Sequence, residues 1–281
     1  MIDFLKTLPQ YLIPKQFISS LLGRLASQTR GQQAVIKWFV KHYNVNMSEA
    51  KHSNISHFKN FNDFFIRELN ANARPIDKTA HAMASPVDGC VSQLGTIKSG
   101  RIIQAKGRDY SILELLGGID EQQKLFLEGH FITLYLSPKD YHRIHMPIDG
   151  TLQEMTYIPG NLFAVKPSTV NAVPNLFARN ERLVMLFETS KGPLAVIMVG
   201  AMVVGSMSTV WQGTLTRSST VVRWQYPSEN VKDVQFKKGQ ELGHFKVGST
   251  VILLTSKNFT HHWRANFGQS SEIKMGQRLT E

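Results

Sequence analysis

The sequence predicts an α+β protein in which amino-terminal amphipathic helices precede a mainly antiparallel β domain. Over residues 1–45, apolar side chains recur at the spacing of one helix face. Beyond residue 74, short apolar runs alternate with glycine, proline, asparagine and aspartate, a pattern typical of strands joined by turns. We therefore expect a helical region at 1–72 and a β-rich domain at 73–281.

Several short helices are expected in the amino-terminal region. Pro9 and Pro14 interrupt the first stretch, and further helices are predicted over 32–43 and 61–69. Lysines and arginines occupy the polar face, whereas Asp3 is the one acid before residue 45. Such helices either lie in the plane of an anionic membrane or fold back on the protein core, and the pattern alone leaves both arrangements open.

The β domain is predicted from its short apolar runs and the turn residues between them. Strands are expected at 89–94, 131–136, 150–158, 183–187, 194–204, 220–224 and 251–254, with a short helix at 111–116. The longest apolar run, 193–205, is too short for a membrane-spanning helix, and its valines and glycines favour buried strands.

Charge and cysteine content narrow the choice of partner. The 32 lysines and arginines exceed the 21 acidic residues, which gives a net charge of +11 and favours contact with polyanions. No nucleic-acid-binding motif is found, so we expect an anionic lipid surface as the partner and no nucleic acid.

The lone Cys90 excludes an internal disulfide and is expected to pack as a small apolar residue. No cleavable signal peptide is evident, so the chain is expected to begin in the cytoplasm.

The most informative motif is Gly-Ser-Thr at 248–250, between a glycine-rich run and an apolar strand. If the Ser249 hydroxyl reaches the carbonyl of Gly248, it can attack it and turn the amide into an ester, provided that a base and oxyanion donors are present. Elimination of that ester leaves a dehydroalanine, which hydrolyses to a pyruvoyl group. The alternative is an ordinary turn between two strands.

An acid and two histidines elsewhere in the chain complete the parts of a serine–histidine–aspartate relay. Asp88 lies in a turn beside a glycine, and His142 and His145 are three residues apart. An imidazole takes up a hydroxyl proton readily near neutral pH, but spacing does not say which histidine faces Ser249. A metal site at the two histidines is the weaker interpretation, because no third ligand of the usual kind is near them, and we expect no metal.

Taken together, these segments resemble the phosphatidylserine decarboxylase family of the bacterial membrane-associated type, whose members are proenzymes that cleave themselves. The matching segments follow one another along nearly the whole chain and lie at 61–69, 74–77, 85–89, 141–147, 157–163, 175–182 and 245–250. One departure is Val247, where the family usually has leucine; this change next to the scissile glycine should alter rate more than chemistry.

The resemblance implies autocatalytic cleavage between Gly248 and Ser249 into a large chain, 1–248, and a small chain, 249–281. It makes His145 the base and Asp88 the group that fixes the tautomer of that base. Ser249 would become the pyruvoyl cofactor, which forms a Schiff base with phosphatidylserine and releases phosphatidylethanolamine. His142 would handle protons during decarboxylation.

The resemblance also implies a location and an assembly. Residues 1–72 would attach the protein peripherally to the cytoplasmic side of the inner membrane, and 73–281 would form the catalytic domain. The two cleaved chains would stay together, and two such protomers would form a homodimer. His261 and His262 are expected to be structural, and Arg179 and Arg182 stay outside the expected site.

Three rival functions remain from the sequence. The fold could belong to a lipid-surface protein that has lost maturation, to a pyruvoyl decarboxylase of a soluble amino acid, or to a hydrolase that uses the same residues. The basic amphipathic region argues against the second, and the third requires Ser249 to survive as a free hydroxyl.

Overall fold

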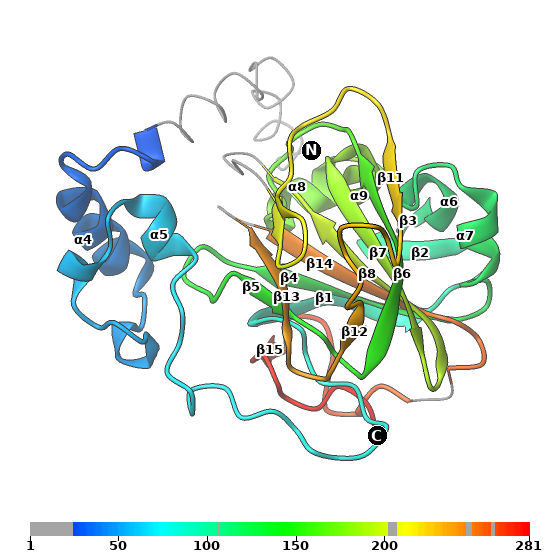
Figure 1. Cartoon of the computed structure of the whole chain (residues 1–281). Coiled ribbons are helices and arrows are strands. Elements are labelled where there is room, and N and C mark those ends of the chain that lie inside the picture. Colours follow the sequence, from blue (N-terminus) through cyan, green and yellow to red (C-terminus); the bar gives the residue numbers. More distant parts are fainter. Residues whose placement is uncertain (1–24, 106, 202–206, 246–248, 260–261) are drawn as a thin grey trace.

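The computed structural model describes residues 25–281 except 106, 202–206, 246–248 and 260–261. A small helical unit lies at one side of a larger β domain, and the chain crosses between them after residue 69 (Figure 1). The α+β class predicted from the sequence is confirmed. The helices predicted before residue 25 lie outside the described residues.

The helical unit contains α4 (Gln32–Tyr43), two 3₁₀ turns, η1 (Met47–Glu49) and η2 (Ile55–His57), and α5 (Phe61–Phe65). Its core consists of apolar side chains from these elements and the loops between them, namely Ile36, Phe39, Val45, Phe58, Phe64 and Phe65. Asn60 caps α5 by accepting a hydrogen bond from the amide of Asp63 at 2.9 Å. The prediction of a helix over 61–69 is wrong at its end, because the chain leaves the helix at Ile66.

One large sheet dominates the β domain, with strand order β11-β6-β7-β8-β14-β4-β1-β15 and β12 paired to β6. All of its pairings are antiparallel. The strands are β1 (Gly89–Thr96), β4 (His130–Leu136), β6 (Gly150–Ile158), β7 (Arg182–Thr189), β8 (Gly192–Val199), β11 (Val222–Gln225), β12 (Gln235–Phe236), β14 (Ser249–Thr255) and β15 (Glu272–Ile273).

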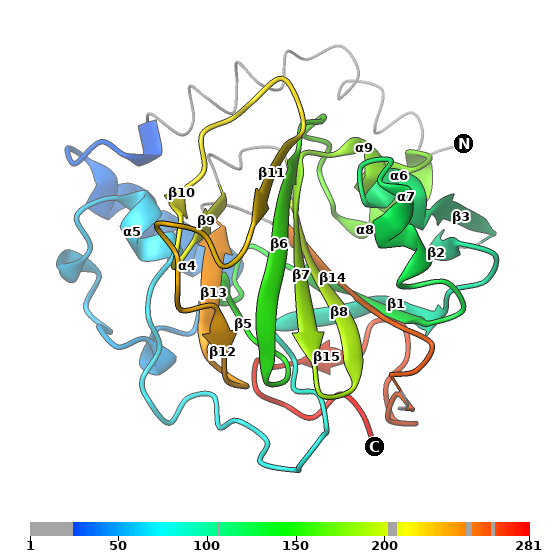
Figure 2. The same ribbon diagram turned by 45° about the vertical axis from the view of Figure 1, so that its right-hand side comes forward.

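Smaller elements flank this sheet. A second sheet, in the order β10-β9-β13-β5, consists of β10 (Gly213–Thr214), β9 (Met207–Thr209), β13 (Glu241–Phe245) and β5 (Arg143–His145). A hairpin of β2 (Arg101–Ala105) and β3 (Arg108–Ser111) lies with α6 (Ile112–Leu115), α7 (Asp120–Lys124), α8 (Pro167–Ala172) and α9 (Leu176–Arg179) on the other side of the main sheet (Figure 2).

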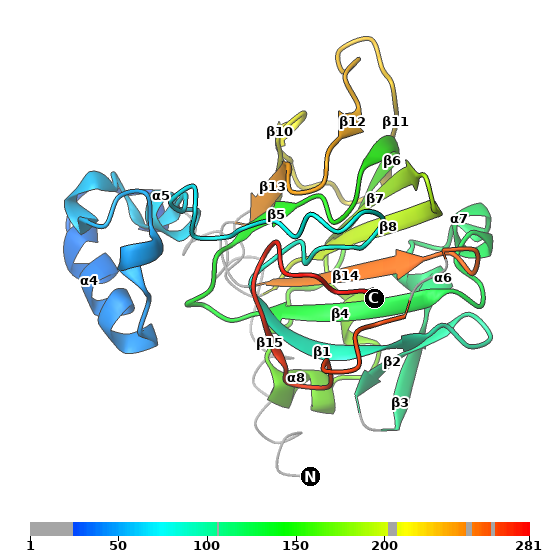
Figure 3. The same cartoon turned by 90° about the horizontal axis from the view of Figure 1, so that it is seen from below.

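The central strands are buried on both faces. In β14, Val251 and Leu253 belong to the core shared with the second sheet, while Ile252 and Leu254 belong to the core beneath the helices and the hairpin. This double burial explains the unbroken apolar run that predicted the strand. Seen from below, β8, β14, β4 and β1 lie side by side and the helical unit is at their end (Figure 3).

Each predicted strand has a counterpart in the main sheet. The helix predicted over 111–116 is α6, with Ser111 as its cap. The run 193–205 forms β8 up to Val199, and 202–206 lie outside the described residues. None of the helices in the described part of the chain combines the length and apolar character needed to cross a membrane.

Candidate active site

Ser249 is the first residue of β14, a central strand of the main sheet. It pairs with Leu136 at the end of β4, and its side chain is fully buried. The Oγ atom has no hydrogen-bond partner among the residues that the structure describes. Gly248, on the other side of the predicted cleavage point, lies outside the described residues. A buried hydroxyl without a partner costs stability, and no structural hydrogen bond has to break before this Oγ reacts.

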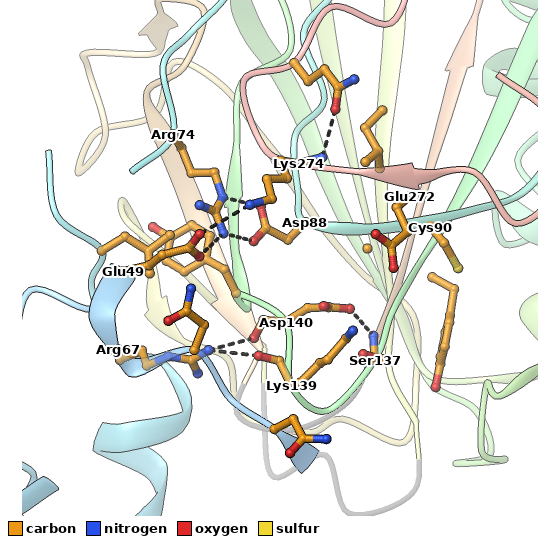
Figure 4. A pocket seen from close by; sticks show the side chains of 18 residues that line it. Glu49, Arg67, Arg74, Asp88, Cys90, Ser137, Lys139, Asp140, Glu272 and Lys274 are labelled. Atoms are coloured by element: carbon orange, nitrogen blue, oxygen red, sulfur yellow. Dashed lines mark hydrogen bonds and ion pairs between the residues drawn. The ribbon is translucent and has the colours of Figure 1, made fainter. Parts of the chain in front are cut away.

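Asp88 lies just before β1 and is buried beside Arg74. The guanidinium donates to both carboxylate oxygens, from Nε at 2.8 Å and from Nη2 at 2.5 Å, and the amide of Met275 donates to Oδ1 at 2.8 Å (Figure 4). Arg74 also donates to Glu49 of the helical unit at 2.8 Å. Asp88 is therefore held by Arg74 and the carboxyl-terminal segment, and Arg74 links it to the helical unit through Glu49.

The backbone conformation and close packing at position 89 explain why a glycine follows Asp88. Its φ of +149° is rarely adopted by other residues, and an added Cβ would lie 2.2 Å from the carbonyl oxygen of Tyr135 on β4. Only glycine lets β1 come this close to β4 directly after Asp88. The turn thus fixes the position of the carboxylate at the end of the sheet.

His145 is the last residue of β5 and accepts one hydrogen bond while donating another. Its Nδ1 is 2.9 Å from the carbonyl of Gly239, and its Nε2 is 3.0 Å from the hydroxyl of Tyr141. Because a carbonyl only accepts, Nδ1 carries the proton and Nε2 accepts from Tyr141. Burial lowers the pKa of His145, while the Gly239 carbonyl and the charges of Glu241 and Asp88 oppose that change.

His142 is fully buried between the helical unit and the end of β4. Its Nε2 is 3.1 Å from the carbonyl of Ser137, and its ring stacks on that of Phe65, with 4.1 Å between centroids. Burial, reinforced by the charge of Arg67, lowers the pKa of His142 to about 3, so the imidazole is neutral. The Nδ1 atom has no hydrogen-bond partner in the described part of the chain.

The two histidines have different relations to Ser249. The amide of Phe245, four residues before Ser249, donates to the carbonyl of His142 at 3.1 Å, whereas His145 pairs with Glu241, further back along β13. His142 also bonds Ser137, next to the partner of Ser249 in the sheet. Within the described residues, Asp88, His145 and Ser249 share no direct hydrogen bond, since Asp88 bonds Arg74 and Met275 while His145 bonds Tyr141 and Gly239.

A cavity of about 550 Å³ opens between the helical unit, the start of β1 and the end of β4. Asp88 and Ser137 line it, and so do charged residues that the sequence did not single out for a site, namely Glu49, Arg67, Arg74, Lys139, Asp140, Glu272 and Lys274 (Figure 4). Of these residues, Arg67 and Arg74 lie in two of the segments that resemble the family, at 61–69 and 74–77. Ser249 does not line this cavity.

The remaining sequence candidates have structural surroundings. Cys90, on β1, is half-buried at the cavity, and burial raises the pKa of its thiol. Arg182 is buried and donates to the carbonyls of Glu114, Leu115 and Asn180. Arg179 lies over the ring of Phe163. His261 falls outside the described residues, and those that are described contain no group of three His, Cys, Asp or Glu able to hold a metal ion.

Replacing Asp88 by asparagine should destabilise the precursor by about 2 kcal/mol, because the buried Arg74 guanidinium loses one of its two carboxylate partners and keeps only Glu49. Urea unfolding of the uncleaved Ser249→Ala chain, with and without Asp88→Asn, measures this difference. The matched control is Asp109→Asn, which breaks an exposed ion pair with Arg101 and should cost less than about 1 kcal/mol. Equal losses for the two variants would contradict the structural role given to Asp88.

A buried serine, two buried histidines and a buried carboxylate are the residue types that a self-processing enzyme uses. Residues 61–281 match the family model described as phosphatidylserine decarboxylase, and 5–44 match a second model described as PSD. The chain belongs to the phosphatidylserine decarboxylase family.

Individual relatives agree with this assignment. The phosphatidylserine decarboxylase proenzyme of Vibrio parahaemolyticus is 55% identical over 260 residues, which cover 91% of each chain. The proenzyme of the same name from Shewanella amazonensis is 52% identical over 279 residues, covering 98% of this chain and 97% of the relative. That from Vibrio cholerae is 54% identical over 259 residues, or 91% of each chain.

Proposed function

We propose that the protein cuts its own chain between Gly248 and Ser249 and that the mature form decarboxylates phosphatidylserine to phosphatidylethanolamine. The observation that carries the proposal is the buried hydroxyl of Ser249 at the start of a central strand, which has no hydrogen-bond partner in the described part of the chain. The relatives bear the name proenzyme, in agreement with maturation by cleavage. The test is the conversion of phosphatidylserine in vesicles by the cleaved protein, with free serine left unchanged.

Self-cleavage begins at the Ser249 hydroxyl. Its oxygen forms a bond to the carbonyl carbon of Gly248, the amide C–N bond breaks, and the proton lost by the hydroxyl passes through a base to the freed amine. Elimination then gives a carboxylate at Gly248 and a dehydroalanine at position 249. Hydrolysis of the dehydroalanine releases ammonia and leaves the pyruvoyl group.

His145 is the proposed base, with Asp88 as its electrostatic partner. Its Nε2 lone pair is the acceptor that the reaction needs, and the Gly239 carbonyl already fixes the proton on Nδ1. The Tyr141 hydroxyl donates to Nε2, so it has to turn away before His145 can take a proton from Ser249. The charge of Asp88 favours the imidazolium that this transfer creates.

His142 is the proposed proton-handling group of decarboxylation. It is neutral and fully buried, and the lone pair on its Nδ1 has no partner within the described residues, as a general base in a water-poor site requires. Phe245 and Ser137 hold it on the Ser249 side of β5. This arrangement supports separate tasks for the two histidines.

A pyruvoyl group at position 249 would supply a ketone that binds the substrate amine and accepts the electron pair released with carbon dioxide. The buried position of Ser249 fits such a group, because it excludes water. The small chain would remain bound after cleavage, since β14 is hydrogen-bonded to β4 over 249–255 and to β8 over 250–255. Loss of one peptide bond at the start of β14 leaves both ladders intact.

Residues 1–72 are the proposed membrane-association region and 73–281 the catalytic domain, on the cytoplasmic face of the inner membrane. The outer face of α4 supports this, because Val35 and Trp38 are exposed beside the cations Lys37 and Lys41. Apolar side chains flanked by cations are what an interfacial helix presents to anionic lipid. Membership of the family suggests that two cleaved protomers pair as a homodimer.

Replacing Trp38 by serine should weaken binding to vesicles that contain phosphatidylserine by roughly tenfold, the equivalent of about 1.4 kcal/mol. Trp38 is 59% exposed, so its removal leaves the core of the helical unit intact. Co-sedimentation with vesicles measures the binding. Ile103→Ser, which removes another exposed apolar side chain from the distant β2, should bind as the wild type does. Equal loss in both variants would contradict a specific role for α4.

A further inference from the structure

The turn that leaves α5 contacts the segment carrying His142 through three successive residues. The ring of Phe65 stacks on the imidazole of His142, with an interplanar angle of 26°. The carbonyl of Ile66 accepts from Nε of Arg143 at 2.9 Å. Nη2 of Arg67 donates to the carbonyl of Lys139 at 2.9 Å and to that of Asp140 at 3.4 Å. The helical unit therefore holds both flanks of His142.

The β domain holds the same histidine from its other sides. The carbonyl of Ser137 accepts from Nε2, and the amide of Phe245 donates to the backbone carbonyl of His142. Because the Ser137 carbonyl only accepts, the proton is on Nε2 and the lone pair is on Nδ1. Stacking on Phe65 fixes the plane of the ring, so the direction of that lone pair is set by the helical unit.

The hydrogen bonds of Arg67 do not compensate for the burial of its side chain. Its side chain is almost fully buried, yet Nε and Nη1 have no hydrogen-bond partner among the described residues. A buried guanidinium with two unsatisfied groups costs stability. Its remaining nitrogen, Nη2, donates to the carbonyls of Lys139 and Asp140, which directly precede Tyr141 and His142. The cost is understandable if the position of that loop matters to the reaction.

We propose that Phe65 and Arg67 are positioning residues that hold the His142 ring in one orientation and one tautomer against the Ser137 carbonyl, so that the helical unit sets the geometry of the proton-handling group. This inference rests on the proposed function for the step that it affects. It also assigns the helical unit a task besides membrane association. The charge of Arg67 adds to burial in keeping the imidazole unprotonated.

The test compares mature Phe65→Leu and wild-type protein, both labelled with ¹⁵N-histidine. The wild type should give a single neutral tautomer at His142, with the proton on Nε2; the signal is assigned by its absence in His142→Ala. Phe65→Leu, which keeps an apolar side chain but removes the flat ring, should mix the two tautomers. Its kcat for phosphatidylserine should fall about tenfold with little change in KM, because binding is kept and orientation is lost.

The matched control is Phe61→Leu, which alters the same aromatic cluster at a residue that does not stack on His142. It should leave both the tautomer signal and kcat as in the wild type. If Phe65→Leu fails to fold, Arg67→Lys decides, since it keeps the charge but loses the paired donation to two carbonyls. It should change the His142 signal and kcat in the same direction.

Failure of this inference and failure of the proposed function give different results. Wild-type values of both the tautomer signal and kcat in Phe65→Leu, or in Arg67→Lys where that variant decides, overturn the inference while the proposed function stands. A wild-type protein that neither cleaves nor converts phosphatidylserine defeats the proposed function, and the tautomer comparison on the uncleaved chain still supports or refutes the positioning of His142.

Discussion

Ser249→Ala should remain a single chain of 281 residues and lose decarboxylation completely. The reason is twofold, because the hydroxyl is both the nucleophile of cleavage and the source of the reactive ketone. An alanine at this position offers neither an oxygen for ester formation nor a leaving group for elimination. A denaturing gel and release of carbon dioxide from phosphatidylserine measure the two effects.

Ser256→Ala is the matched control for this loss. Ser256 directly follows β14, and its buried Oγ also lacks a hydrogen-bond partner among the described residues. Its removal should leave cleavage and activity unchanged, because the hydroxyl is at the far end of the strand from Gly248. Cleavage of the Ser249→Ala chain at the same bond, or activity without cleavage, would contradict the account.

Alanine substitutions at the two histidines should have separable effects. His145→Ala should slow cleavage by at least about 100-fold, the usual contribution of a general base, so that most of the protein stays uncleaved. His142→Ala should cleave, yet its mature form should lose about 100-fold in decarboxylation because protons are no longer handled at the reacting carbon. Time courses of cleavage, followed by assays of the mature fraction, give both rates.

His52→Ala is the control, since His52 is exposed and stacks on His57 in the helical unit. Both of its rates should equal those of the wild type. Because His142 lies on the Ser249 side of β5, the experiment also tests whether His142 and not His145 is the base of cleavage. Blocked cleavage in His142→Ala with normal cleavage in His145→Ala would exchange the two roles.

The fold was predictable where apolar periodicity is strong. The run 251–254 predicted β14 because both faces of that strand are buried, and the structure extends it to Ser249 through pairing with Leu136. Strands such as β13, with Glu241 and His244 among its five residues, carry no such pattern and were missed. The end of α5 was also missed, because the chain leaves the helix at Ile66 and Arg67 then donates to the carbonyls of Lys139 and Asp140, which are distant in sequence.

The candidate site was predictable in its residue types and less so in its contacts. Motifs brought Asp88, the two histidines and Ser249 to notice, and all four are buried at the same end of the β domain. Their partners come from distant segments, as Arg74 does for Asp88 and Phe65 for His142. Sequence spacing carries no information about such contacts, which form only when the helical unit packs against the sheet.

The intact mass of the purified protein under denaturing conditions tests self-maturation most directly. We expect two chains, the smaller comprising residues 249–281 and lighter than its encoded mass by one ammonia, as the exchange of serine for pyruvoyl requires. A single uncleaved chain, or a small chain that keeps an intact amino-terminal serine, would contradict the proposal that Ser249 supplies the reactive group.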